Sequence, residues 1–310
     1  MSIVVIGAIF VDIKGFSEYQ YLPEGRNKGH IQYIHGGVAR NVVENIANIE
    51  LRPTFVSLVN TEAVGQDVIR RLKQHKVNTD YIRTVPNGSG TWLAVFDENG
   101  DLAGSISERP DLMPIYDILK EHGDELFQNC TSVVLEADID RDIANLVFHL
   151  ARKYNKKVFS IVSNMAIALR RRDLIKNFDC FVCNDIEAGQ LFQKDYSSMS
   201  VEDMMEELRK DVEAAEIKAM VVTLGARGSI FTDNTGKVGY MPAYKAELKD
   251  TTVAGDAFCS VLVIGLSYGK SLEEACKIGT KLACAVITSF SNTCPRFLPA
   301  ELGIDYIPQD

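Results

Sequence analysis

Short apolar segments recur along the chain and alternate with longer stretches of helical periodicity. The short segments are rich in β-branched residues and have the length of strands. They occupy residues 3–8, 55–59, 132–135, 157–162, 180–183 and 219–224. Several contain few alternating polar residues, which is typical of parallel strands that are covered on both faces.

Helical periodicity fills the intervals between these strands. Apolar residues recur every three or four positions within residues 39–49 and 143–150, and long apolar helices are predicted near 255–268 and 272–290. Strands that alternate with helices form right-handed βαβ units around a parallel sheet. The sequence therefore predicts an α/β fold with a parallel sheet flanked by helices, and we expect residues 1–310 to form a single domain.

Two insertions interrupt this alternation, at about residues 14–34 and 88–110. The first is rich in polar and aromatic residues and has no helical period. The second predicts a hairpin, because Asn99-Gly100 supplies the positive φ angles of a tight turn. We expect both insertions to form a small β sheet outside the parallel core, where it would act as a lid. An exposed edge of this sheet could pair with a second subunit, which allows a homodimer through the lid.

The composition is that of a soluble globular protein. Apolar residues make up 46% and charged residues 24% of the chain, and the formal net charge is −9. No basic cluster extends beyond Arg170, Arg171 and Arg172, so nucleic acid is not expected as a partner. No apolar run reaches the roughly 20 residues of a membrane span, and the N-terminal residues predict a strand rather than a signal peptide.

The seven cysteines are irregularly spaced, which indicates reduced thiols and a cytoplasmic protein. Cys180 and Cys183 form a C-x-x-C pair within a predicted strand. Residues three positions apart on a strand point to opposite faces, so we expect no shared metal and no disulfide between them.

The strongest chemical signal runs from Asp250 to Phe258, Asp-Thr-Thr-Val-Ala-Gly-Asp-Ala-Phe, where a turn of small residues opens into an apolar helix. Free N–H groups and the dipole at a helix N-terminus favour an anion. Asp256 lies in the first turn of this helix. An aspartate at this position could be merely a helix cap. Asp250 and Thr252 add oxygen ligands upstream, however, and favour a chemical role for Asp256.

Three further segments place polar groups beside predicted elements. Gly36 and Gly37 precede a helix, which lets the backbone approach a ligand closely, whereas Arg40 and Glu44 have the spacing of a surface ion pair. A second segment, Asn184-Asp-Ile-Glu, follows a predicted strand and fits either a helix cap or a magnesium site. The third segment, residues 223–228, is by itself a glycine turn into a hairpin.

Together these segments resemble the motifs of the ribokinase or phosphofructokinase-B family of carbohydrate and nucleoside kinases, in the family's order and across nearly the whole chain. The segment ending at Asp256 is similar to the family's D-T-x-G-A-G-D signature. The resemblance implies a ribokinase-like fold with Asp256 as catalytic base and an anion hole at Ala254, Gly255 and Asp256. It also implies that Asp250 helps to bind a monovalent cation. Val253 departs from the family's glycine, and a β-branched residue resists positive φ.

The same resemblance assigns the remaining ligands. It implies that the substrate is bound by Asp12, Gly36, Gly37 and Asn41. It implies that ATP is bound by Asn184, Thr223, Gly225, Gly228 and Thr252. Glu187 matches the glutamate of the family's N-x-x-E motif, which organises Mg²⁺ through water, and one carboxylate suits an ion that keeps several waters.

The resemblance therefore predicts an ATP-dependent kinase that phosphorylates a primary hydroxyl and uses ATP, Mg²⁺ and K⁺. Residues 36–45, Gly-Gly-Val-Ala-Arg-Asn-Val-Val-Glu-Asn, are more similar to the pseudouridine kinase branch, so pseudouridine is the expected substrate. A ribokinase- or fructokinase-like sugar kinase is the alternative, and Val253 leaves open a non-catalytic sensor. The lone tryptophan, Trp92, could stack on a nucleobase or pack the lid onto the core. A dinucleotide enzyme is disfavoured because no G-x-G-x-x-G follows the first strand.

Overall fold

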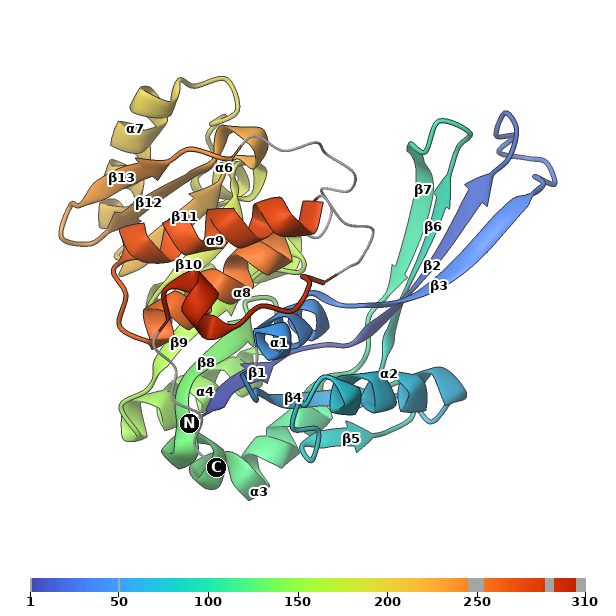
Figure 1. The fold of residues 1–310 in the computed structure, drawn as a ribbon, viewed down its shortest axis with the longest axis horizontal. Coiled ribbons are helices and arrows are strands. Elements are labelled where there is room, and N and C mark those ends of the chain that lie inside the picture. The colour runs from blue at the N-terminus through green and yellow to red at the C-terminus, as the bar shows by residue number, and fades with distance from the viewer. Residues whose placement is uncertain (1, 50, 245–253, 288–292, 305–310) are drawn as a thin grey trace.

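The predicted strands form the core of the protein (Figure 1). The computed structural model describes residues 2–49, 51–244, 254–287 and 293–304. The predicted strands are β1 (Ser2–Ile6), β4 (Thr54–Val59), β8 (Cys130–Glu136), β9 (Lys157–Ile161), β10 (Phe181–Asn184) and β11 (Ala219–Thr223). Each is confirmed, with ends that differ from the prediction by one or two residues.

Two sheets make up the core layer. The first is parallel, in the order β5-β4-β1-β8-β9, and includes the short strand β5 (Ile82–Thr84). The second has the order β10-β11-β12-β13, in which β12 (Ser229–Asp233) and β13 (Val238–Met241) form an antiparallel hairpin. A parallel bridge between Phe159 and Cys180 brings β9 next to the start of β10. The predicted parallel arrangement is thus confirmed for β1, β4, β8, β9, β10 and β11, and β5 is a further parallel strand.

Helices cover both faces of this layer. One buried apolar cluster receives side chains from α1 (Val38–Asn48), α2 (Ala63–Gln74), α8 (Ala254–Ser267) and α9 (Leu272–Ile287). The opposite cluster receives them from α3 (Met113–Asn129), α4 (Arg141–Lys153), α5 (Met165–Ala168), α6 (Asp185–Phe192) and α7 (Val201–Ala214). Short 3₁₀ helices are η1 (Leu169–Asn177), η2 (Gly225–Arg227) and η3 (Pro299–Leu302). Successive β1 residues enter opposite clusters, Ile3 and Val5 one and Val4 and Ile6 the other, as the two-residue period of a strand requires.

The two insertions form a separate sheet that extends sideways from the body (Figure 1). Its order is β3-β2-β6-β7, with β2 (Phe10–Ser17), β3 (Gly29–Gly36), β6 (Gly90–Phe96) and β7 (Leu102–Glu108). Strand β2 begins four residues before the expected start of the first insertion, and only residues 7–9 separate it from β1. This β3-β2-β6-β7 sheet, the lid, is therefore connected to the first core strand by only a short segment.

Cys180 and Cys183 are buried free thiols on opposite sides of the sheet. Cys180 belongs to the cluster beneath α8 and α9, and Cys183 to the cluster on the other face. The prediction that they point to opposite faces of the sheet is confirmed. In the described ranges, no helix has both the length and the apolar character needed to cross a membrane.

Candidate active site

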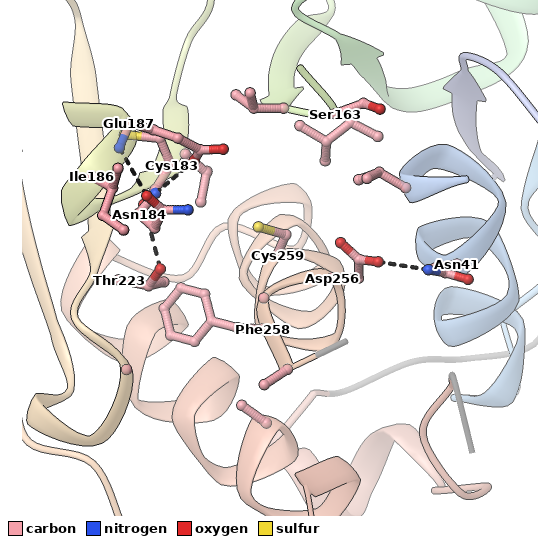
Figure 2. Close-up of a pocket in the computed structure, with 18 of the residues that line it drawn as sticks. Asn41, Ser163, Cys183, Asn184, Ile186, Glu187, Thr223, Asp256, Phe258 and Cys259 are labelled. Carbon is pink, nitrogen blue, oxygen red and sulfur yellow. Dashed lines mark hydrogen bonds between the residues drawn. The ribbon is translucent and has the colours of Figure 1, made fainter. Parts of the chain in front are cut away.

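A cavity of about 1190 Å³ lies between the lid, the carboxyl ends of core strands and the N-terminus of α8 (Figure 2). Open α/β sheets bind ligands at this edge. Most of the predicted site residues line it: Asp12, Gly37, Asn41, Asn184, Glu187, Thr223, Gly225, Gly228, Ala254, Gly255 and Asp256. Gly36 is adjacent to the lining but not part of it. Asp250, Thr252 and Val253 lie outside the described residues.

Asp256 and Asn41 meet in this cavity. Asp256 lies in the first turn of α8, and its Oδ2 accepts a hydrogen bond of 2.7 Å from Asn41 Nδ2 on α1 (Figure 2). Burial raises the pKa of Asp256 to about 7; the bond from Asn41 and the charge of Arg40 oppose this rise, and Glu187 and Asp12 add to it. A carboxyl group with a pKa near neutrality is suited to take a proton from a hydroxyl at physiological pH.

Asp12 enters the same cavity from lid strand β2. Burial raises the pKa of Asp12, while the charges of Lys14 and Arg40 act in the opposite direction. Gly36 on the neighbouring strand leaves room for this carboxylate, because a Cβ at Gly36 would lie 2.2 Å from Asp12 Oδ1. Gly37, the N-cap of α1, has a φ of 95°, which favours glycine. The glycine pair thus brings the start of α1 close to the carboxylate on the lid.

Arg40 and Glu44 form the ion pair that their spacing predicts, with 2.8 Å between Arg40 Nη1 and Glu44 Oε2. The interpretation as a surface pair is wrong, because the two side chains are only 1% and 0% exposed. Every residue of α1 from Ala39 to Asn48 is buried. Helix α1 packs against α8 and the core sheet, and Glu44 also contacts Arg71 of α2, so no face of the helix is left to solvent.

Asn184 and Glu187 form a capping box at the start of α6. Asn184 Oδ1 accepts from Glu187 N, and Glu187 Oε2 accepts from Asn184 N, both at 2.8 Å (Figure 2). Burial raises the pKa of Glu187, and the Asn184 N–H opposes this. The helix-cap interpretation is therefore correct. The box also holds the Glu187 carboxylate at the cavity wall, where an oxygen ligand of this type suits Mg²⁺.

The opposite end of the cavity is built from the turn between β11 and β12. Thr223 Oγ1 donates to Cys183 O at 3.5 Å, which links the ends of β11 and β10 (Figure 2). Gly225 and Gly228 have φ angles of 57° and 104°, and a Cβ at Gly228 would lie 2.1 Å from Met241 O. Gly228 therefore allows the close approach of the end of β13, and both glycines line the cavity.

Glu136 is an important residue that the sequence analysis missed. It ends β8, is 0% exposed, and accepts hydrogen bonds from Ala8 N at 2.9 Å and Ala39 N at 3.3 Å. Burial and the nearby Asp138 raise the pKa of Glu136. Glycine is required at Gly7, where a Cβ would lie 2.7 Å from Glu136 Cδ. The signal in the sequence was an acidic residue at the end of an apolar strand.

The lid contributes Lys14 and Trp92 to the cavity wall. The ammonium group of Lys14 lies 5.9 Å from the centre of the Trp92 ring, a cation–π contact. Trp92 also meets Phe96 edge-on and packs against the core cluster. Trp92 therefore both packs the lid and faces the cavity, and Lys14 was not singled out from the sequence.

Residues 1–296 match the pfkB family of carbohydrate kinases. The chain belongs to this family. This kinase is accordingly an ATP-dependent phosphotransferase of the carbohydrate and nucleoside kinase class, and kinases of this class use ATP with Mg²⁺. The expected family, fold and general activity are confirmed.

Curated relatives span both nucleoside and sugar kinases. A guanosine-inosine kinase of Exiguobacterium acetylicum is 32% identical over 302 residues, which cover 96% of this chain and 99% of the relative. A pseudouridine kinase of Escherichia coli (strain K12) is 24% identical over 279 residues, 88% of this chain and 87% of the relative. The relative that acts on the substrate expected from the sequence is therefore less similar to this chain than the guanosine-inosine kinase is.

Solved structures share the fold along the whole chain. Arabidopsis thaliana ribokinase, complexed with ribose and ATP, has a TM-score of 0.82 at 21% identity and covers 97% of this kinase and 98% of that chain. Adenosine kinase from Sinorhizobium meliloti has a TM-score of 0.76 at 19% identity and covers 97% and 98%. At these identities the likeness concerns the fold alone.

Proposed function

We propose that this kinase transfers the γ-phosphoryl group of ATP to the 5′-hydroxyl of a ribonucleoside. The observation that carries the proposal is the carboxylate of Asp256, which is half-buried at the N-terminus of α8 and accepts a hydrogen bond of 2.7 Å from Asn41. The similarity to the guanosine-inosine kinase extends over 99% of that enzyme's length, and it supports a nucleoside acceptor. A base with a pKa of about 7 at a helix N-terminus matches the needs of phosphoryl transfer to an alcohol.

In the proposed reaction, Asp256 takes the hydroxyl proton as the acceptor oxygen bonds to the γ-phosphorus. The bond between that phosphorus and the bridging oxygen of ADP breaks, and ADP leaves with the electron pair. Backbone amides at Ala254, Gly255 and Asp256 would donate to the migrating phosphoryl group, because N–H groups in a first helical turn have no partner within the helix. Asp12 and Asn41 would bind the ribosyl hydroxyls, with Gly36 and Gly37 allowing close approach.

The nucleotide is proposed to lie along the turn after β11. Its ligands would be Asn184, Thr223, Gly225, Gly228 and Thr252. Gly225 and Gly228 line the cavity on this side, and Glu187 would hold Mg²⁺ through water. When bound, Mg²⁺ neutralises charge on the phosphate oxygens.

Among ribonucleosides, we propose a base with a ring carbonyl. Lys14 carries only hydrogen-bond donors and lines the cavity beside Trp92, whose ring offers a stacking surface worth about 1–3 kcal/mol. Guanine, hypoxanthine and uracil carry carbonyl acceptors, whereas adenine carries an amino donor at the equivalent position. Guanosine and inosine are the first candidates because of the 32% identical relative, and pseudouridine is the second because of residues 36–45.

ADP release with a panel of acceptors tests the proposal. The panel contains guanosine, inosine, pseudouridine, uridine, adenosine, ribose and fructose. We expect the highest kcat/KM for nucleosides with a ring carbonyl, and we expect Trp92→Ala to raise KM for nucleosides more than for ribose. Faster turnover of ribose or fructose than of every nucleoside identifies a sugar kinase. Acceptor binding without any ADP release identifies a sensor.

A monovalent cation is proposed to bind near Asp250, at the start of the signature segment. Its charge would organise the segment that precedes α8. We expect turnover to be higher in potassium than in lithium at constant ionic strength, because the larger ion sheds its hydration water more readily. Equal rates in the two salts contradict the site.

We further propose a homodimer through the lid, formed by its outer face rather than its edge. Four large apolar side chains on that face are 41–70% exposed: Ile31, Tyr33, Leu93 and Ile106. Strand register places them on the side opposite Asp12, which points into the cavity. Exposed apolar patches of this kind mark interaction surfaces. Light scattering should give the mass of a dimer, and Ile106→Asp should give that of a folded monomer; a monomeric wild type contradicts the proposal.

A further inference from the structure

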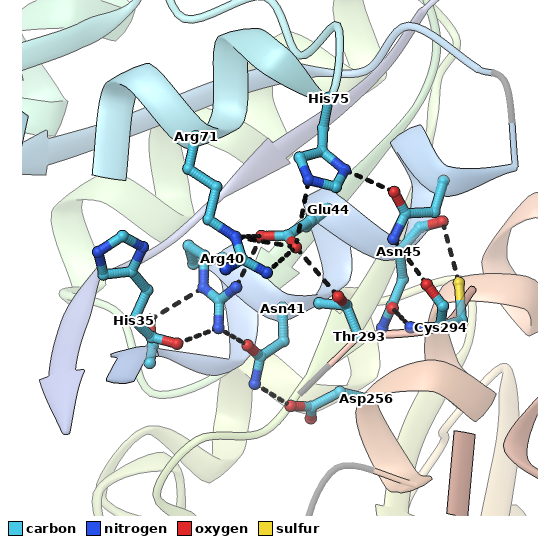
Figure 3. Close-up of polar contacts among 12 residues, drawn as sticks. His35, Arg40, Asn41, Glu44, Asn45, Arg71, His75, Asp256, Thr293 and Cys294 are labelled. Carbon is cyan, nitrogen blue, oxygen red and sulfur yellow. Dashed lines mark hydrogen bonds and ion pairs between the residues drawn. The ribbon is translucent and has the colours of Figure 1, made fainter. Parts of the chain in front are cut away.

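Helix α1 buries a charged pair next to Asn41, which hydrogen-bonds the proposed base Asp256 on α8. Arg40 and Glu44 are 2.8 Å apart and 1% and 0% exposed. A buried ion pair is weak evidence for stability, because the cost of removing both charges from water offsets most of their attraction. The location of this pair beside Asn41 and Asp256 points instead to a role in organising the site (Figure 3).

The guanidinium group of Arg40 fixes the orientation of its neighbour Asn41. Arg40 Nη2 donates to Asn41 Oδ1 and to the carbonyl oxygen of His35, and Arg40 Nη1 donates to Glu44 (Figure 3). Arginine has donors and no acceptor, so the atom of Asn41 that faces it must be the amide oxygen. The amide NH₂ is then directed at Asp256 Oδ2, 2.7 Å away.

This orientation determines how Asn41 acts on the base. An NH₂ group donates to Asp256 and stabilises the ionised carboxylate, which is the form that can accept a proton. A flipped amide would present its oxygen to Asp256 and favour the protonated carboxyl, which cannot act as a base. The two faces of the same side chain thus have opposite effects on the reaction.

We infer that Arg40 is a positioning residue, which holds the amide of Asn41 so that its NH₂ group faces and orients the carboxylate of Asp256. The inference rests on the proposed role of Asp256 as the base. The charge of Arg40 acts in the same direction as the amide, since it also lowers the pKa of Asp256.

Other charged and titratable groups around Asp256 come from β2, from α6 and from α8 itself. Asp12 of β2 and Glu187 of α6 raise the pKa of Asp256. Cys259, one turn along α8, has a pKa raised well above its usual range by burial and remains a neutral thiol. Among these described groups, the charge of Arg40 opposes the two carboxylates and burial.

Glu44 binds Arg40 and is itself held by side chains from outside α1. Arg71 Nη2 of α2 lies 2.8 Å from Glu44 Oε1, and Thr293 Oγ1 donates to the same oxygen at 3.0 Å (Figure 3). Burial disfavours the ionised Glu44, but the bond from Arg71 and the charges of Arg40, Arg71 and His75 hold its pKa at about 2. Arg71 is a matched control, because it binds the same carboxylate and, within the described part of the chain, forms no hydrogen bond with Asn41 or Asp256.

The test compares Arg40→Met with Arg71→Met in the full-length enzyme. Methionine preserves the length of the side chain and removes every donor. For Arg40→Met we expect kcat for the nucleoside to fall roughly 10–100-fold, as expected when a reacting group is misplaced by about 1 Å. We also expect the acid limb of the kcat/KM profile to shift to higher pH, with a smaller change in KM. Arg71→Met should keep the wild-type limb even if its melting temperature falls.

A second variant and a second measurement keep the test decisive. Arg40→Met/Glu44→Gln removes both charges of the pair, so it avoids an uncompensated buried carboxylate and should show the same shift of the acid limb. Titration of the Asp256 carboxyl by ¹³C NMR, assigned with Asp256→Asn, needs no substrate. If the NMR titration is shifted in the Arg40 variants but the protein phosphorylates no acceptor, the positioning role of Arg40 is upheld and the proposed function is rejected. Wild-type turnover of a nucleoside with an unshifted titration and limb in both Arg40 variants upholds the function and overturns the inference.

Discussion

Replacing Asp256 with asparagine is expected to lower kcat by about two to four orders of magnitude, which is the usual contribution of a general base. Asparagine keeps the shape of the side chain but cannot accept the hydroxyl proton. Steady-state ADP release with the best acceptor of the panel measures the loss. Circular dichroism and the melting temperature check that the variant is folded.

Glu274→Gln is a suitable control for this experiment. Glu274 also lies in a first helical turn, where it accepts from Ser271 N at 2.9 Å, but it is exposed at the start of α9. Its replacement should leave kcat unchanged. If Asp256→Asn behaves like Glu274→Gln, then Asp256 is a helix cap and not the base.

The raised pKa of Asp256 also gives a direction for its effect on stability. The folded-state value of about 7 exceeds the unfolded value near 3.8. The contribution of this group to stability is therefore present at low pH and is lost as the pH rises through about 7. Asp256→Asn should consequently melt at a higher temperature than the wild type at pH 8, a trade of stability for activity that is common at active sites.

Replacing Glu136 with alanine is expected to reduce the free energy of unfolding by about 2–6 kcal/mol, since each of two buried N–H groups left without an acceptor costs about 1–3 kcal/mol. The groups are Ala8 N, after β1, and Ala39 N, in the first turn of α1. Urea denaturation measures the change. Because the same bonds hold the start of α1, the KM of the acceptor should also rise.

Glu136→Gln is the matched variant, since it retains one carbonyl acceptor and should lose less stability than Glu136→Ala. The pKa of Glu136 is raised by burial, so its ionisation destabilises the folded protein as the pH rises through the folded-state pKa. The glutamine variant should therefore lose stability less steeply than the wild type between pH 4.5 and about pH 8. Equal stability of Glu136→Ala and the wild type would mean that other groups satisfy the two donors.

The fold was predictable because its strands are short, apolar and separated by helical periods. Residues 55–59 and 219–224, for example, have no competing interpretation, since they are too short for helices and too apolar for loops. Strand β5 was missed because three residues carry no detectable period. The site was predictable only in part: motif resemblance singled out Asn41 and Asp256, but nothing local indicates that they meet across the molecule.

Sequence spacing can indicate which side chains pair, but it cannot indicate whether the pair is buried. The spacing of Arg40 and Glu44 correctly predicted an ion pair, but an i,i+4 pair is normally exposed. Its burial follows from packing of α1 against α8 and α2, which are distant in sequence. Glu136 was missed for the same reason, because its partners Ala8 and Ala39 offer only backbone groups, which leave no mark in the sequence.

The direct connection of β1 to β2 bears on how ATP is protected from water. Asp12 and Trp92 belong to the lid, whereas Asn41 and Asp256 belong to the body. In the proposed binding mode the acceptor contacts both parts, while ATP at the β11 turn would contact the body alone. The acceptor would thus be the ligand that draws the lid inwards, and the γ-phosphate would be shielded only when a hydroxyl is present to receive it. The strand that carries a substrate ligand would then also limit wasteful hydrolysis.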